Sequence, residues 1–185
     1  MDEVRARLAA RRGEAPENPE PPLDMRRAGV LIPLFVRDGA LWVLFTRRTE
    51  TVEHHRGQIS FPGGSEEEDD GSLLETALRE TREEIGVEET DVCYLGELSP
   101  LTTVTDFYVE PYVGAIPSPY AFRVADAEIA ELIEAPVAAL LDPKILERKI
   151  LPGREEATLF YHHGRHVIWG ATARMLKELL DALKA

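Results

Sequence analysis

The clearest pattern near the start of the chain is a pair of apolar, β-branched runs at residues 28–36 and 41–46. Runs of this kind, bounded by turn residues, are typical of β-strands. Asp38 and Gly39 lie between them, and this dipeptide favours the tight turn of a β-hairpin. Pro33 lies within the first run and has no amide hydrogen to donate, so we expect an edge or a bulge there.

The rest of the chain alternates between helical and extended patterns, which predicts a mixed α/β (α+β) fold. Residues 72–85 have a helical period, and residues 128–141 are also predicted to be helical, with a break at Pro136. The other predicted elements are helices at 3–11 and from 171 to about 183, strands near 59–61, 92–95, 108–116, 149–151, 157–162 and 166–169, and an extended, proline-rich connector at 13–22.

Length and composition indicate a globular protein with one main domain. The 185 residues are 44% apolar and 30% charged, which suits a folded domain with a sizeable core. No apolar run approaches the roughly 20 residues that span a bilayer, and the N-terminus lacks the apolar segment of a secretory signal. The single cysteine, Cys93, excludes an internal disulfide and a cysteine-based zinc site. We therefore expect a cytoplasmic protein with no membrane partner, in which residues 1–27 form a helix and connector and residues 28–185 form the domain.

The net charge of −13 changes the picture of possible partners. Binding to a nucleic-acid backbone normally needs a basic surface, so nucleic acid is not expected as a partner. An acidic protein can still bind a phosphorylated small molecule when divalent cations lie between the two sets of negative groups. The acidic residues therefore either form a solvated surface or bind metal, and their positions decide which.

The predicted helix at residues 72–85 has recognisable ends. Ser72 is a candidate N-cap with Glu75 as its capping-box partner, and Gly86 stands where a C-terminal glycine is expected. On a helical wheel the core-facing stripe is predicted to comprise Leu74, Leu78, Thr81 and Ile85.

Glu80, Glu83 and Glu84 fall on the roughly opposite arc of that wheel. Their i, i+3 and i+4 spacing puts the Cβ atoms about 5–6 Å apart, so the carboxylates could share one or two metal ions. Carboxylate oxygens suit Mg²⁺ or Mn²⁺, which also bind substrate phosphates. The alternative is a solvated face in which the glutamates pair with Arg79 and Arg82.

The context of this helix resembles a known signature. Residues 61–64 read Phe-Pro-Gly-Gly, acidic residues follow at 66–70, and residues 79–87 read Arg-Glu-Thr-Arg-Glu-Glu-Ile-Gly-Val. This order is similar to the Nudix box, the signature of a large family of Mg²⁺-dependent hydrolases of nucleoside diphosphates linked to another group. The second half of the box matches throughout, with Thr81 replacing an apolar residue.

The first half of the box departs from the family pattern. Gly64 lies one residue too far from Arg79, and Asp70 or Glu68 must stand in for the first glutamate. The resemblance implies the Nudix fold, in which a mixed β-sheet is sandwiched between α-helices.

The resemblance also implies roles for individual residues. Glu80 and Glu84 would be metal ligands, and Glu83 would be a ligand or the base that activates water. The Gly63 carbonyl would supply a further ligand, and Arg79 would orient a glutamate by a charge-assisted hydrogen bond.

Upstream of the box, the sequence is similar to the coenzyme A pyrophosphatase branch of the family. Thr46, His55 and Gly57 stand in register with an additional motif of that branch. Segments 98–105 and 168–174 also look like that branch. The departures from the motif are Thr49 in place of serine, residues 52–53 (Val-Glu) in place of Leu-Arg, and Glu67 in place of aspartate.

Coenzyme A carries a pyrophosphate and a 3′-phosphate, and guanidinium groups suit phosphate. Arg47, Arg48 and Arg56 cluster in an otherwise acidic sequence and, with His55 and Gln58, are candidate substrate-binding residues. For any one of these arginines the alternative is an ion pair with the acidic loop that precedes the helix, and His55 could instead hold its own loop in place.

Two other readings of function stay open at this point. Within the same chemistry, the substrate could be ADP-ribose, a dinucleotide polyphosphate or a damaged nucleoside triphosphate. In a different class, the chain could be a binding module of Nudix fold without catalysis, although such a module has no evident use for the glutamate cluster. The protein could be a monomer or a homodimer.

Overall fold

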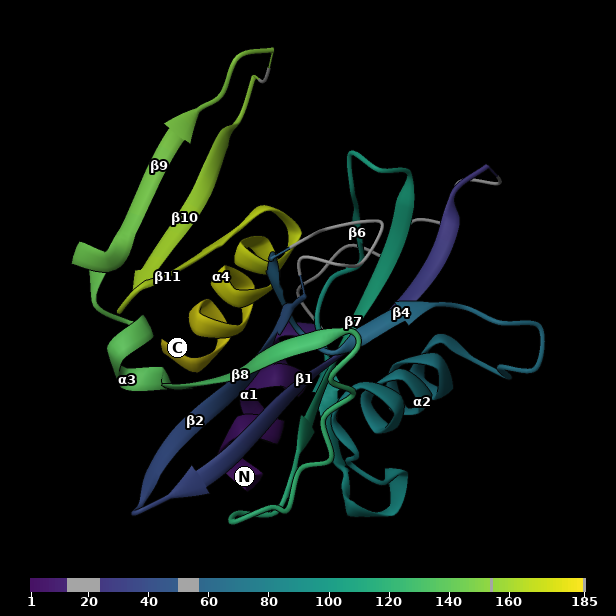
Figure 1. The fold of residues 1–185 in the computed structure, drawn as a ribbon. Helices are drawn as coiled ribbons and strands as arrows, with labels where there is room; N and C mark the ends of the chain where they lie inside the picture. The colour runs from purple at the N-terminus through teal and green to yellow at the C-terminus, as the bar shows by residue number, and fades with distance from the viewer. Residues whose placement is uncertain (13–23, 50–56, 154, 185) are drawn as a thin grey trace.

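The computed structural model describes residues 1–12, 24–49, 57–153 and 155–184 (Figure 1). Residues 13–22, the predicted connector, lie outside the described residues. The helices are α1 (Asp2–Arg12), α2 (Leu73–Ile85), α3 (Val137–Leu140) and α4 (Gly170–Lys184), with short 3₁₀ turns at Glu89–Asp91 and Pro143–Ile145. Among the described helices none is long and apolar enough to cross a membrane.

The larger sheet is mixed, and strand β1 (Arg26–Arg37) lies at its centre. β1 runs parallel to β7 (Phe107–Ala115) and antiparallel to β2 (Ala40–Arg48), so the predicted hairpin is confirmed. The other strands of this sheet are β3 (Ile59–Ser60), β4 (Gly63–Ser65), β5 (Cys93–Glu97), β6 (Leu101–Thr102) and β8 (Ile129–Pro136), while β9 (Leu146–Ile150), β10 (Ala157–His163) and β11 (His166–Trp169) form a separate antiparallel sheet.

Helices cover both faces of the mixed sheet, as predicted (Figure 1). Leu31 of β1 packs beneath α2, whereas Ile32, its neighbour, belongs to the main core with residues of α4. This alternation follows from the two-residue period of a strand. Helix α1 buries Val4 and Leu8 in that same main core, so the N-terminal helix packs on the domain.

The predicted edge or bulge at Pro33 is wrong, because β1 has partners on both sides. On one side β1 pairs with β7 without interruption, and Pro33 lies opposite Gly114. On the other side β1 pairs with β4 through residues 28–30 and with β2 through residues 34–37. Pro33 therefore lies in the gap between two partners, where a missing amide hydrogen breaks no ladder hydrogen bond.

The predicted helix at residues 128–141 is also wrong. Residues Ile129–Pro136 form strand β8, which pairs antiparallel with β2, and only Val137–Leu140 is helical. Ile129, Ile133 and Val137 are buried at a spacing of four residues, which fits one face of a helix and also one face of a strand. Pairing with β2 decides between the two, and that contact is not local in sequence.

Helix α2 begins and ends where the sequence predicts. The Ser72 hydroxyl accepts the Glu75 amide hydrogen bond at 3.2 Å, and Gly86 closes the helix in the left-handed conformation with φ of 71°. The Glu75 carboxylate accepts from the amide of Gly71 at 3.0 Å, one residue earlier than an ideal capping box. The loop after β7 also fixes this helix end, because the Ala125 amide donates to the Glu84 carbonyl at 2.9 Å.

Candidate active site on helix α2

The face of α2 that packs on the sheet includes a glutamate of the predicted metal set. The buried residues of the helix are Leu73, Thr76, Ala77, Thr81, Glu84 and Ile85. The Glu84 side chain is 3% exposed, that of Glu80 is 20% exposed, and that of Glu83 is 54% exposed. The wheel-based prediction that these glutamates lie opposite the core is therefore wrong for Glu84. The exposure of the three carboxylates instead rises from Glu84 on the buried face of the helix, through Glu80, to Glu83 in solvent.

Arg79 joins α2 to the acidic loop that precedes it. Its Nε donates to Asp70 Oδ1 at 3.1 Å and its Nη2 donates to Asp70 Oδ2 at 3.0 Å, which is a two-pronged pair. Asp70 Oδ2 also accepts from the Thr76 hydroxyl and the Glu67 amide, both at 2.9 Å. These donors, Arg79 first, hold the pKa of Asp70 well below its usual range. Of the two loop carboxylates considered for this position, Asp70 contacts Arg79, and Glu68 is exposed.

The remaining nitrogen of Arg79 reaches the helix glutamates. Nη1 donates to Glu80 Oε1 at 3.0 Å and to Glu83 Oε2 at 3.4 Å. Burial is the main cause that raises the pKa of Glu80; Arg79 opposes this rise and Glu83 adds to it. Arg79 thus fixes two carboxylates of the helix relative to the loop.

Glu84 has a different partner, Arg48 at the end of β2. Arg48 Nη1 donates to Glu84 Oε1 at 3.2 Å, while Glu84 Oε2 is buried and has no hydrogen-bond partner among the described residues. The same holds for the buried Nε of Arg48 within this part of the chain. Burial raises the pKa of Glu84 to about 8, with Glu80 adding to the rise and Arg48 opposing it.

Two glycines of the Phe-Pro-Gly-Gly run lie against these carboxylates. A Cβ atom on Gly64 would lie 2.5 Å from the carboxyl carbon of Glu80, so any other residue would push that carboxylate out of its present position. A hydrogen bond from the backbone of Gly63 counteracts the rise in the pKa of Glu84. Strand β4 therefore lies against Glu80 and Glu84.

In the described part of the chain, no three carboxylate, histidine or cysteine side chains converge closely enough to hold one metal ion. The glutamates are engaged with Arg79 and Arg48 instead. Three features still fit a hard divalent cation: oxygen-only donors, the unpartnered buried Oε2 of Glu84, and the space that Gly64 leaves beside Glu80. The residues present therefore suit such an ion.

Comparison with known proteins agrees with the signature in the sequence. A family model described as the NUDIX domain matches residues 25–158. The uncharacterized Nudix hydrolase NudL of Photorhabdus laumondii is 34% identical over 161 residues, which cover 86% of this chain and 86% of that protein. The chain belongs to the Nudix hydrolase family.

Solved structures show the same fold at low sequence identity. The Nudix hydrolase RenU of M. smegmatis aligns with a TM-score of 0.55 and 15% identity, covering 86% of each chain. The NUDIX domain of Shewanella oneidensis NrtR, solved in complex with ADP ribose, aligns with a TM-score of 0.52 and 20% identity, covering 72% of this chain and 85% of that one. The predicted Nudix fold is thereby confirmed.

The predicted substrate-binding residues of this Nudix hydrolase do not all lie together. Arg48 lies at the glutamates, whereas the Nε of Arg47, the adjacent residue, donates to Glu131 Oε2 at 3.1 Å. The Gln58 carbonyl accepts from the Arg48 amide at 3.0 Å, which fixes the end of β2. His55 and Arg56 lie outside the described residues. Neither Arg47 nor Arg48 has an ion pair with the acidic loop among the pairs described.

Glu128, in the loop before β8, is a member of the site that the sequence did not reveal. Arg48 Nη2 donates to Glu128 Oε2 at 3.4 Å, and the Glu128 charge contributes to the raised pKa of both Glu80 and Glu84. The Glu128 carbonyl accepts from the Thr49 amide at 2.7 Å, so the pairing of β8 with β2 brings it here. No local sequence pattern marks Glu128, because it lies outside the Nudix box and at the start of a segment whose pattern predicts a helix.

Proposed function

We propose that this Nudix hydrolase cleaves a phosphoanhydride with the help of Mg²⁺ or Mn²⁺ bound by Glu80 and Glu84. The observation that carries the proposal is the buried, unpartnered Oε2 of Glu84 beside Glu80, on the helix that holds the Nudix box. A buried carboxylate with an oxygen that lacks a partner is costly, and a cation on that oxygen offsets the cost. When bound, such an ion neutralises phosphoryl charge and lowers the pKa of a coordinated water.

The chain's own residues have separable tasks in this reaction. Arg79 holds Glu80 and Glu83 at fixed positions, and Asp70 in turn holds Arg79. Glu83 is the most exposed of the three helix carboxylates, and its one hydrogen bond among the described residues is the 3.4 Å contact to Arg79, so it suits the acceptance of a proton from the attacking water. The water oxygen forms a bond to phosphorus, the bridging P–O bond breaks, and one water is consumed for each anhydride cleaved.

Coenzyme A is the substrate that we propose, and the support comes from the flanking segments. Within segments 98–105 and 168–174, the Arg174 Nη1 donates to the Thr102 carbonyl at 3.2 Å. The hydroxyl of Thr172 donates to the Ile59 carbonyl at 3.2 Å, two residues before Phe61 and the glycines. The segments that resemble the coenzyme A pyrophosphatase branch therefore contact one another and the strand that leads into the box.

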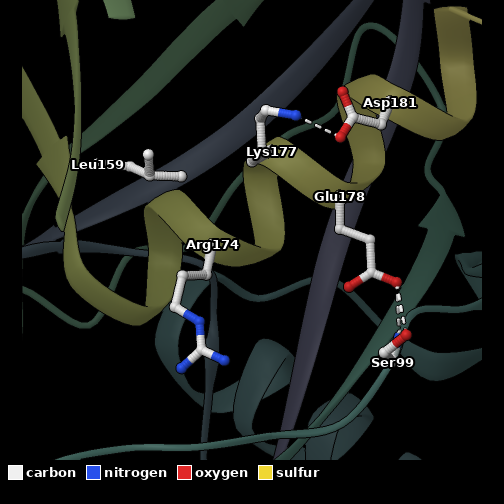
Figure 2. A pocket seen from close by; sticks show the side chains of 6 residues that line it. All are labelled: Ser99, Leu159, Arg174, Lys177, Glu178 and Asp181. Carbon is white, nitrogen blue, oxygen red and sulfur yellow. Dashed lines mark hydrogen bonds and ion pairs between the residues drawn. The ribbon is translucent and has the colours of Figure 1, made fainter. Parts of the chain in front are cut away.

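A pocket of about 330 Å³ on α4 lies beside this junction but is a poor candidate for the reaction site (Figure 2). Its charged side chains already have partners. Lys177 pairs with Asp181, and Glu178 accepts from the amide and hydroxyl of Ser99 at 3.0 and 2.8 Å. None of the residues that line it belongs to the glutamate cluster. We therefore assign it a structural role in joining α4 to the segment at Ser99.

A substrate panel tests the proposed activity. The purified chain is incubated with Mg²⁺ or Mn²⁺ and with coenzyme A, ADP-ribose, a dinucleotide polyphosphate or an oxidised nucleoside triphosphate, and the products are identified by mass spectrometry. Coenzyme A is expected to give 4′-phosphopantetheine and adenosine 3′,5′-bisphosphate with the highest kcat/KM. Faster cleavage of ADP-ribose, the ligand in the NrtR structure, would contradict coenzyme A as the preferred substrate. It would still agree with the proposed hydrolysis of a phosphoanhydride.

The metal assignment has its own test. Glu84→Gln keeps the side-chain shape and removes the charge, so hydrolysis of every substrate is expected to fall by at least about a hundredfold. Glu68→Gln, on the exposed loop, is the matched control and is expected to retain activity. Unchanged hydrolysis in Glu84→Gln would refute the metal assignment, and binding of substrate without any cleavage in the wild type would favour the non-catalytic reading.

A further inference from the structure

Two buried polar atoms at the site, Glu84 Oε2 and Arg48 Nε, have no partner in the described part of the chain, and both belong to one ion pair. That pair is joined by a single hydrogen bond of 3.2 Å. By contrast, Arg37 and Glu134 form a two-pronged pair, with hydrogen bonds of 2.6 and 2.8 Å. Each member of the Arg48–Glu84 pair therefore has unused hydrogen-bonding capacity in a place where water does not reach it.

The guanidinium of Arg48 is divided between two carboxylates. Nη1 contacts Glu84, and Nη2 contacts Glu128 at 3.4 Å. A divalent cation on Glu84 would need the same carboxylate and would also repel the guanidinium. Arg48 and the metal therefore compete for Glu84 by charge and not for one oxygen atom, because Arg48 contacts Oε1 and the metal would bind Oε2. Arg48 can respond by turning to another anion.

We propose that Arg48 is a resident counter-ion of Glu84 that is exchanged for the metal and then binds a phosphate oxygen of the substrate. The inference rests on the proposed function and adds an order of events to it. In the metal-free protein Arg48 neutralises the buried carboxylate. Metal binding releases the guanidinium, whose planar, five-donor fork suits a phosphate group. Metal and phosphate then bind cooperatively, because the first ligand frees the residue that the second one needs.

Arg48→Gln tests this exchange through binding rather than turnover. The affinity for Mn²⁺ alone, measured by electron paramagnetic resonance titration of the free ion, is expected to increase about three- to tenfold because a competitor is lost. Affinity for α,β-methylene-ADP, whose bridging carbon resists hydrolysis, is measured by calorimetry with and without Mg²⁺. With Mg²⁺ the variant is expected to bind it at least about tenfold more weakly than the wild type, and without Mg²⁺ nearly as well as the wild type.

Two further variants separate exchange from general electrostatics. Arg37→Gln also removes one positive charge and breaks an ion pair with a β8 glutamate, outside the site, and is expected to change neither affinity. Arg48→Lys keeps the charge and loses the fork, so its Mn²⁺ affinity is expected to stay near that of the wild type while its affinity for the analogue falls. Arg48→Lys also keeps the test available if Arg48→Gln does not fold.

Several outcomes would overturn the exchange. Weaker or unchanged Mn²⁺ binding in folded Arg48→Gln would show that Arg48 does not compete with the metal. An equal loss of analogue affinity with and without Mg²⁺ would show that Arg48 contacts phosphate independently of metal. Failure of the wild type to bind Mn²⁺ at all would instead refute the proposed function, which separates the two conclusions.

Discussion

Two of the arginine–carboxylate pairs at this site, Arg79–Asp70 and Arg48–Glu84, are built differently. Arg79 and Asp70 share two hydrogen bonds, and Asp70 has two further donors, so the Asp70 carboxylate is well satisfied. Arg48 and Glu84 share one hydrogen bond, and each keeps a buried polar atom for which the described residues supply no partner. The first pair has the geometry of a structural anchor, and the second leaves a carboxylate oxygen available to bind a ligand.

The pKa shifts follow the same division. Hydrogen bonds from Arg79 lower the pKa of Asp70, whereas burial raises the pKa of Glu84 to about 8 despite Arg48. Ionised Asp70 therefore stabilises the fold, and ionised Glu84 destabilises it when no cation is present. A residue that costs stability in the free protein is a candidate for function, since folding alone gives no reason for it.

The largest effect is expected from breaking the anchor. Asp70→Ala leaves Arg79, whose side chain is 17% exposed, without its two-pronged partner. Removing one member of a largely buried ion pair costs about 3 kcal/mol, because the other charge remains desolvated. Urea denaturation at pH 7 should show a loss of unfolding free energy of this size, together with a lower kcat because Glu80 and Glu83 lose their positioning.

Glu68→Ala is the matched control for this experiment, since it removes an exposed carboxylate from the same loop. Its unfolding free energy is expected to lie within about 0.5 kcal/mol of the wild type. Equal losses in the two variants would contradict the special role of Asp70.

Glu84→Gln should raise the free energy of unfolding of the metal-free protein, whereas Asp70→Ala lowers it. The pKa of Glu84 is raised from 4.5 to about 8 on folding, so the folded state binds more protons than the unfolded state between these values. Stability due to this group is therefore present below about pH 4.5 and is lost as the pH rises toward 8. In EDTA at pH 9 the variant should be more stable than the wild type by about 2 kcal/mol.

Urea unfolding of both proteins at pH 5 and pH 9 measures this difference. The advantage of Glu84→Gln should shrink toward pH 5 in EDTA, and added Mg²⁺ should stabilise only the wild type. A variant that is less stable than the wild type at pH 9 would mean that Arg48 fully compensates the buried charge.

Gly64→Ala is expected to have a smaller effect, confined to the ligand site. The added Cβ atom would meet the Glu80 carboxylate at 2.5 Å, and that flexible side chain would move away from β4. Metal affinity should fall about tenfold, equivalent to about 1.4 kcal/mol, with little change in the melting temperature. Gly71→Ala is the control, because its Cβ atom would meet the Glu75 carboxylate at 2.9 Å, outside the site. Equal Mn²⁺ affinity in Gly64→Ala and the wild type would contradict the assignment of Glu80.

Much of helix α2 could be predicted from the sequence, because its determinants are local. Ser72 and Gly86 define its ends through contacts within a few residues, and the spacing of the glutamates lies within two turns. The mixed fold followed from the same kind of signal together with the Nudix box. The orientation of the helix was harder, since the wheel did not anticipate that Glu84 belongs to the buried face.

The parts that could not be predicted depend on contacts between distant segments. Strand β8 was expected to be a helix, because only its pairing with β2 distinguishes the two readings. The different partners of Arg47 and Arg48, and the approach of Glu128, depend on that same pairing. A sequence pattern shows which residue types are available, and strand pairing decides which of them meet.

The smallest effect is expected from a substitution of Glu128, which contacts Arg48 of the Arg48–Glu84 pair but is largely exposed. Its side chain is 54% exposed and holds Arg48 through one 3.4 Å hydrogen bond. Glu128→Gln removes a charge that favours a cation and also frees Arg48 to engage Glu84 more closely. Both changes oppose metal binding, so Mn²⁺ affinity should fall about two- to threefold in the same titration, as expected for screened, exposed charges. Asp126→Asn, on the same loop and exposed, is the control. An equal fall in Mn²⁺ affinity in that variant would mean that Glu128 acts only through the overall negative charge of the loop.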